Sequence, residues 1–252
     1  MVFVRFVVSF HMNFDTTPEQ QAVVERARGV AKRIRSVAAA IDKAGRVPEE
    51  MTQVLIGEAL IDPFVADEVT AVLIIEELAS ASAGLAASLG FGSAAGSGAG
   101  GTVIPPSLSG LRGAAFELAG VQRATGSTMR RARLVCCGCA LGVGRAAVNH
   151  AVAVMKRTNI RPGGDEKVPH WALADAAAEL DAARLLTLNA AQMMQRDEPS
   201  EQAIDLAKML SASAADKAVQ AAIRIEGEDG YARAGLLERL ARDARTLTVI
   251  LP

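Results

Sequence analysis

Long segments with apolar residues at helical spacing fill the second half of the chain, and this pattern constrains the fold most. Leu134, Cys137 and Leu141 illustrate the spacing. Prolines and glycines interrupt the pattern at residues 162–164, 198–199 and 227–230. We expect helices over residues 114–124, 128–158, 169–196, 199–226 and 234–250. Long helices joined by brief loops pack antiparallel, so residues 128–252 are expected to form a four-helix bundle.

The first part of the chain predicts a smaller helical portion over residues 12–90. Thr17, Pro18 and Gln20 form a helix-start signal, in which Thr17 caps and Gln20 completes a capping box. The first helix should end near residue 43. A second should run from Pro48 to about residue 61, and a third from about residue 67 to residue 89.

Residues 91–127 separate these two portions and differ from both in composition. Their first part is rich in glycine, serine and alanine, which favours a flexible linker that buries little apolar area. Apolar residues make up 50% of the chain but aromatic residues only 4%, so small aliphatic side chains must form the core. This composition favours closely packed helices and predicts a mainly α protein.

Charge and cysteine usage exclude several classes of protein. The 27 basic and 28 acidic residues leave a net charge of -1, which gives no electrostatic reason to expect nucleic acid or an anionic membrane as partner. Cys136, Cys137 and Cys139 lie in one apolar run and suit small buried residues of a cytoplasmic protein. No second cysteine or histidine cluster completes a metal site, so no metal is expected. The apolar first eleven residues are too short for a membrane span.

Several short motifs recur in an order and spacing that resemble the acyl-CoA dehydrogenase family. In the N-terminal part they are Phe14-Asp15, Ile41-Asp42, Gly45-Arg46-Val47-Pro48 and Glu76-Glu77-Leu78-Ala79. In the C-terminal part they are Ala140-Leu141-Gly142, Leu173-Ala174-Asp175, Ala182-Ala183-Arg184-Leu185-Leu186, Ala207-Lys208, Gly230-Tyr231 and Arg242-Asp243-Ala244-Arg245. The resemblance implies an N-terminal helical domain, a middle β-domain and a C-terminal four-helix bundle. Here residues 91–127 replace most of the β-domain.

The resemblance also implies a bound FAD and an acyl-CoA substrate, but this chain departs from the family at the implied site. Arg157, Arg224, Gly227 and Gly230 fall on positions that contact FAD in the family. Glu228 replaces a glycine of the same loop and adds a negative charge. The family's catalytic glutamate, which removes the substrate α-proton, falls on Leu251. An alternative base position falls on Ala132, and neither side chain accepts a proton.

These departures lead to three hypotheses. The chain is expected to be a non-catalytic subunit, in a homodimer or a hetero-oligomer, that supports a full-length acyl-CoA dehydrogenase. Alternatively, it binds FAD as a homo-oligomer and dehydrogenates an acyl-CoA with a carboxylate such as Glu226 or Glu228. A third reading is a scaffold bundle without cofactor.

Overall fold

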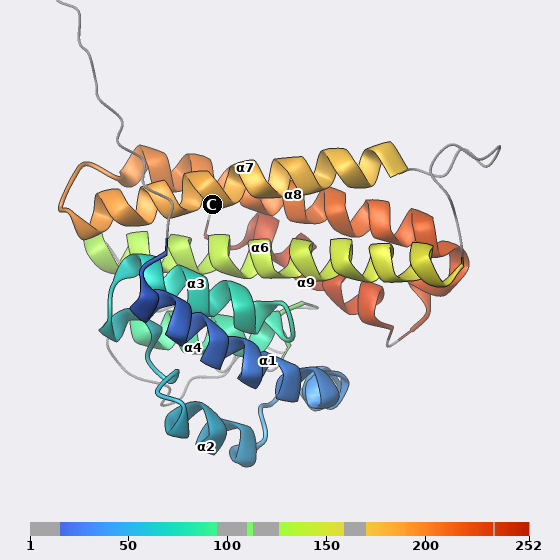
Figure 1. The fold of residues 1–252 in the computed structure, drawn as a ribbon, viewed down its shortest axis with the longest axis horizontal. Helices are drawn as coiled ribbons and strands as arrows, with labels where there is room; N and C mark the ends of the chain where they lie inside the picture. The colour runs from blue at the N-terminus through green and yellow to red at the C-terminus, as the bar shows by residue number, and fades with distance from the viewer. Residues whose placement is uncertain (1–15, 95–109, 113–125, 159–169, 234, 252) are drawn as a thin grey trace, which may run out of the picture.

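The computed structural model describes residues 16–94, 110–112, 126–158, 170–233 and 235–251, and these residues form a mainly helical protein (Figure 1). The helices are α1 (Pro18–Ala44), α2 (Glu49–Gly57), α3 (Glu68–Ala79), α4 (Ala83–Ala94), α6 (Gly126–Arg157), α7 (His170–Gln195), α8 (Glu201–Glu226) and α9 (Leu236–Val249). Two short 3-10 helices, η1 (Pro63–Val65) and η2 (Gly227–Tyr231), complete the elements. The described ranges contain no β-strand, which confirms the mainly α prediction.

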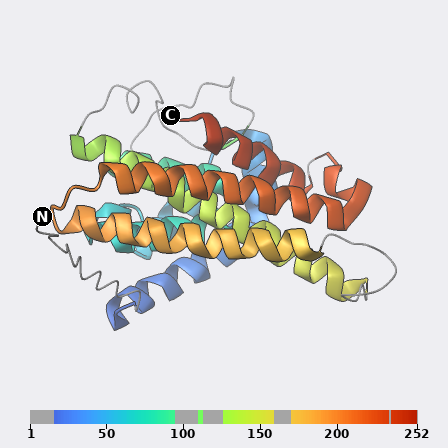
Figure 2. The same cartoon turned by 90° about the horizontal axis from the view of Figure 1, so that it is seen from above.

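The helices form two parts that share α6. On one side α6 packs against α7, α8 and α9, and this is the predicted four-helix bundle. On the other side α3 and α4 pack against α6, while α1 lies outside α3. Figure 2 shows α7, α8 and α9 side by side, with the α6 ribbon beneath them. The small N-terminal helical portion is therefore joined to the bundle through a buried contact.

The start of α1 follows from local sequence. The Thr17 hydroxyl accepts a hydrogen bond from the Gln20 backbone N–H, and the Gln20 side chain accepts one from the Thr17 N–H. This reciprocal capping box satisfies two donors that a helix start otherwise leaves open. At the other end Gly45 adopts a left-handed conformation and stops the helix. Both ends of this helix agree with the sequence prediction.

The single helix predicted over residues 67–89 is wrong, because the structure divides it into α3 and α4. The Ser80 hydroxyl donates to the Glu77 carbonyl oxygen at the end of α3. The Ser82 hydroxyl then accepts from the Leu85 N–H at the start of α4, at 3.4 Å. Serine side chains compete with the helical backbone bonds in this way, so two serines break an otherwise apolar helix.

The predicted linker boundary near residue 90 is also too early. Helix α4 continues to Ala94 through Gly90 and Gly92. A Cβ on Gly90 would lie 2.7 Å from Val135 Cγ1, so the missing side chain lets α4 approach α6 closely. Of the remaining linker only residues 110–112 and 126–127 are described, and the last two begin α6. The helix expected over residues 114–124 lies outside the described residues, and the linker's role as a β-domain remnant stays a prediction.

Candidate cofactor-binding end of the helix bundle

The C-terminal ends of α6 and α8 lie at the same end of the bundle, and all four predicted cofactor residues belong to this end. Arg157 is the last residue of α6, Arg224 lies in the last turn of α8, and Gly227 and Gly230 lie in η2. The side chains of His150 and Glu226 link the two helices, with 2.9 Å between Nε2 and Oε2. The fold therefore gathers the predicted residues in one region, as Figure 1 shows at the right-hand end of α6 and α8.

Both glycines have a structural reason to be there. Gly227 ends α8 with φ of 76° and ψ of -141°, a conformation that only glycine adopts without strain. Its N–H is used within the cap, since it donates to the Ile223 carbonyl oxygen. Gly230 is buried, and a Cβ there would lie 3.2 Å from the Ile223 Cα. Chain geometry therefore accounts for both residues before any ligand is considered.

The two arginines are exposed cations. Within the described residues, neither Arg157 nor Arg224 has a hydrogen-bond or ion-pair partner. The carboxylates of Glu228 and Asp229 are exposed in the same loop. Because Glu226 is paired with His150, its carboxylate is not free to act as an unassisted base. This end of the bundle therefore combines two arginines and two exposed acids without ion-pair partners among the described residues, and the acids weaken its attraction for a pyrophosphate.

Two aromatic residues at this end were missed by the sequence reasoning. Trp171, the second residue of α7, is 83% exposed, and Tyr231 at the end of η2 is 70% exposed. They are the only tryptophan and tyrosine of the chain. Their position beside glycine- and proline-containing breakers was the available sequence signal.

The two positions expected to hold a catalytic base lie in the core. Leu251 is 2% exposed, Ala132 is 0% exposed, and both belong to the main hydrophobic cluster. A groove lined by Arg133 of α6 and Thr248 of α9 shows that the end of α9 lies beside the start of α6. Both positions are therefore at the end of the bundle opposite Arg157, and apolar side chains fill them.

Asp243 is the carboxylate nearest to Leu251 in sequence, and it has a structural role. Its Oδ1 accepts a hydrogen bond of 2.6 Å from the Leu111 backbone N–H. Burial raises the pKa of Asp243 to about 6, and the Leu111 hydrogen bond and the charges of Arg239 and Arg242 oppose that rise. Arg242 itself pairs with Asp42 and Glu238. Asp243 therefore ties residues 110–112 to α9.

The three cysteines are inert structural residues, as their spacing predicted. All three are buried and unpaired in disulfides. Burial raises the pKa of Cys136 and Cys137 to about 12, so the reactive thiolate is scarce at neutral pH. The described part of the chain also holds no group of three metal-binding side chains.

Two adjacent acids in α3 form the main charged cluster of the interior. Glu76 Oε1 lies 2.9 Å from Arg145 Nη1, and Glu76 Oε2 lies 2.8 Å from Arg184 Nε. Glu77 pairs with Arg145 at 2.8 Å and with Arg28 at 3.2 Å. Arginines from three helices thus neutralise two buried carboxylates of a fourth. The cluster joins the N-terminal helices to the bundle and leaves neither acid free for catalysis.

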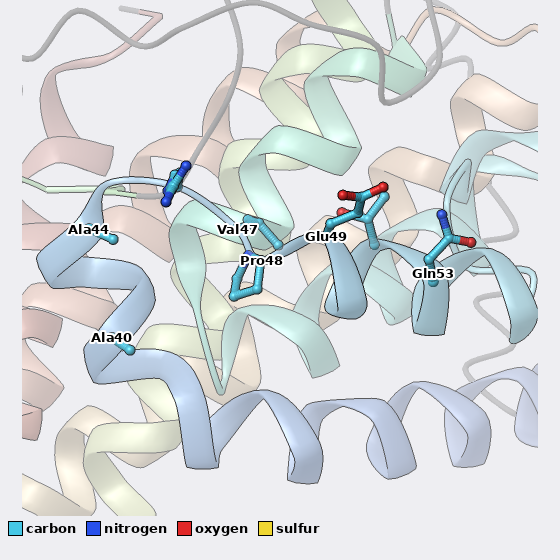
Figure 3. A pocket seen from close by; sticks show the side chains of 8 residues that line it. Ala40, Ala44, Val47, Pro48, Glu49 and Gln53 are labelled. Carbon is cyan, nitrogen blue, oxygen red and sulfur yellow. The ribbon is translucent and has the colours of Figure 1, made fainter.

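A separate groove of about 700 Å³ lies at the turn between α1 and α2. Figure 3 shows Val47 and Pro48 at this turn, with Glu49 and Gln53 on α2. The groove contains no predicted site residue and no cluster of titratable groups. We assign it no chemistry.

Helix α6 is the one described helix that is long and apolar enough to cross a membrane by length and composition. Its most apolar window is 67% buried among the other helices, which is typical of the central helix of a bundle. Length and composition alone are therefore weak evidence for a membrane span.

Comparison with known proteins gives the family. The family model "Acyl-CoA dehydrogenase, C-terminal domain" matches residues 119–250. A 3-(aryl)acrylate reductase of Clostridium sporogenes is 35% identical over 112 residues, which are 44% of this chain and 30% of that protein. A 3-sulfinopropanoyl-CoA desulfinase of Paraburkholderia xenovorans is 38% identical over 112 residues, again 44% of this chain and 29% of that protein. The match thus spans about three-tenths of the length of these relatives.

Comparison of the structure with solved structures agrees with this family and covers a larger part of the chain. The structure of butyryl-CoA dehydrogenase from Megasphaera elsdenii superposes with a TM-score of 0.74 and 16% identity, covering 95% of this chain and 96% of that one. At this identity the likeness concerns the fold alone. The family model, the ordered motifs and the bundle agree, and the chain belongs to the acyl-CoA dehydrogenase family.

Proposed function

We propose that this chain is a non-catalytic subunit of the acyl-CoA dehydrogenase type, which associates with a full-length member of the family in the cytoplasm. The observation that carries the proposal is the contrast at the two expected base positions. Leu251 and Ala132 are buried and apolar, yet α6, α7, α8 and α9 pack as a bundle. A side chain without a titratable group cannot take the substrate proton, so the chain keeps the fold without the base.

An apolar outer face on α7 and α8 supports association. Lys217 of α8 pairs with Glu179 of α7 at 2.7 Å, which sets the antiparallel register of the two helices. In this register Leu185 and Leu186 lie beside the stripe made by Leu206, Met209 and Leu210. All five are exposed, and we call them the α7–α8 patch. A contiguous exposed apolar patch typically marks a protein–protein interface.

The cofactor end of the bundle fits a supporting role better than an independent one. Exposed Arg157 and Arg224 suit contact with a phosphate of an FAD held mainly by the partner. The acids Glu228 and Asp229 in the same loop oppose tight binding by this chain alone. FAD supplies hydride-accepting chemistry in enzymes that bind it, and that chemistry would belong to the partner.

The free arginines also favour a second candidate, in which two copies of this chain hold FAD and act on an acyl-CoA. The α7–α8 patch could then pair with itself. This candidate requires a proton acceptor from another part of the chain, such as Glu228. A Glu228→Gln variant with unchanged turnover would remove that residue as the base. A cofactor-free scaffold is the remaining alternative.

Co-expression tests the proposal. A tagged copy of this chain should co-purify in fixed stoichiometry with a full-length acyl-CoA dehydrogenase encoded in the same genome. The double variant Leu206→Asp, Met209→Asp should abolish the complex, because it places two charges in the patch. The matched control Ile56→Asp, Val65→Asp changes two exposed apolar residues far from the patch and should leave the complex intact. Failure of every such dehydrogenase to co-purify would contradict the proposal.

A further inference from the structure

A groove of about 550 Å³ lies where α6, α8 and α9 meet, at the end of the bundle opposite Arg157. Helix α8 forms its floor with residues spaced three or four apart, which therefore lie on one helix face. Among them Asp205, Lys208 and Asp216 are charged, and Met209 and Ala212 are apolar. The groove is separate from the cofactor end and was not suggested by any motif.

Ion pairs neutralise both carboxylates of this groove. Arg133 Nη1 lies 2.7 Å from Asp205 Oδ1, which joins α6 to α8. Arg245 Nη2 lies 3.6 Å from Asp216 Oδ2, which joins α9 to α8. Asp216 also accepts a hydrogen bond from Gln220. Neither acid is therefore available to a further cation.

Lys208 is the third cation of the groove, and within the described residues its ammonium has no hydrogen-bond or ion-pair partner. Three cations against two carboxylates leave the lining with one excess positive charge. Lys208 lies about one helical turn along α8 from Asp205, the residue that Arg133 contacts, and both cations line the groove. Lys208 is half-buried as a residue, and an ammonium without a partner in the described residues is a favourable anchor for an anion.

The remaining lining suits a small ligand with one charged end. The Ser213 hydroxyl has no partner within the described residues, so it can donate to an anion. The Thr248 hydroxyl donates to the Arg245 carbonyl oxygen at 2.7 Å, so its own oxygen remains an acceptor. Met209 and Ala212 supply an apolar wall beside these polar groups. Small-molecule pockets commonly combine an apolar lining with a few fixed polar groups.

We propose that this groove binds a small anionic ligand, with its carboxylate or phosphate at Lys208 and Ser213 and a short apolar body against Met209 and Ala212. The two ion pairs flank the groove and join α6 and α9 to α8. This site is separate from the cofactor end, but it shares Met209 with the α7–α8 patch, so it is tested on the chain without a partner.

Calorimetric titration tests the site, with inorganic phosphate and butanoate as separate probes at an ionic strength fixed by sodium chloride. The wild-type chain should bind at least one probe saturably. Lys208→Met should weaken binding by about tenfold or more, because a charge-assisted hydrogen bond is lost. Lys208→Arg should retain binding, and Lys217→Met, on the same helix outside the groove, should not alter it. Binding of phosphate alone or of butanoate alone would identify the anionic head group.

A second variant is expected to bind the probe more tightly, a result that unfolding of the chain could not explain. Asp205→Asn removes the carboxylate that neutralises Arg133, so it should tighten binding by a factor of a few while the circular dichroism spectrum stays unchanged. Absence of saturable binding of both probes by the wild type would overturn the proposal. Equal affinity of the Lys208→Met variant and the wild type would overturn it as well.

Discussion

The contact between α3 and α6 and the loop at the end of α8 represent opposite uses of charge in this protein. In the first, Glu76 and Glu77 are buried and matched by arginines from three helices. In the second, Arg224 and Glu228 are exposed, as is Arg157 at the adjacent end of α6, and the described residues offer none of the three an ion-pair partner. The matched region holds the two parts of the fold together, and the unmatched one can change charge without cost to the fold. The comparison shows that charge stabilises the fold at the first region and contributes little to it at the second.

The largest effect should come from a substitution that adds a side chain at the close contact between α3 and α6. A Cβ on Gly142 would overlap the Glu76 carbonyl oxygen and lie 2.7 Å from Ala79 Cβ. Gly142→Val should therefore lower the free energy of unfolding by about 3 kcal/mol, measured by urea denaturation. Gly29→Ala is the control, because nothing lies within 4 Å of that Cβ position. That variant should be neutral or stabilising by up to about 1 kcal/mol. Equal effects at the two glycines would contradict the close contact.

Breaking the buried charge cluster should have a somewhat smaller effect. Glu76→Gln leaves Arg145 and Arg184 without their shared carboxylate, and both arginines are about one-third exposed. Partial solvation reduces the penalty, so we expect a loss of about 2 kcal/mol. Glu179→Gln removes one partner of an exposed pair and should cost less than about 0.5 kcal/mol. Similar losses for both variants would show that burial does not strengthen the cluster.

Asp243 should make stability depend on pH in the acid range. Burial raises the pKa of Asp243 to about 6 from a usual value of 3.8, so the folded state holds the proton more readily than the unfolded state. The wild type should therefore lose stability relative to Asp243→Asn as pH rises from about 4 to 7, by about 2 kcal/mol. Asparagine retains an acceptor for the Leu111 N–H. Urea denaturation at several pH values measures the difference, and a difference independent of pH would exclude a raised pKa.

The smallest effects on stability are expected at the exposed loop. Gly227→Ala should cost about 1 kcal/mol, because alanine is strained at a φ of 76°. Arg157→Ala should change the free energy of unfolding by less than about 0.5 kcal/mol, because the side chain is exposed and unpaired within the described residues. Thermal and urea unfolding of both variants would check this order. A large loss for Arg157→Ala would mean that the loop is part of the structural framework.

Local sequence predicted some elements well because their causes are local. The capping box at Thr17 and the glycine stops at Gly45 and Gly227 are each fixed by a few adjacent residues. Break points at Ser80 and Ser82 could not be predicted, since serine is tolerated in many helices and only tertiary packing decides the outcome.

The candidate site likewise has a part that was predicted from the sequence and a part that depends on tertiary packing. Counting along the motifs brought Arg157, Arg224, Gly227 and Gly230 to one end of the bundle, as the structure places them. Their role as cofactor contacts stays a prediction. The groove around Lys208 could not be predicted, because it depends on three helices that meet from distant parts of the chain. Trp171 and Tyr231 lie beside glycine- and proline-containing breaks in the sequence, but sequence spacing does not say which side of a loop faces solvent, so their exposure was not predicted.

The proposed function predicts that this chain assembles as a subunit without catalysing the family's reaction. The most direct measurement is the visible spectrum of the chain purified alone, before and after addition of a panel of acyl-CoA thioesters without oxygen. We predict less than stoichiometric flavin and no bleaching of any flavin absorbance near 450 nm. Stoichiometric flavin that is bleached by an acyl-CoA in the chain alone would contradict the account.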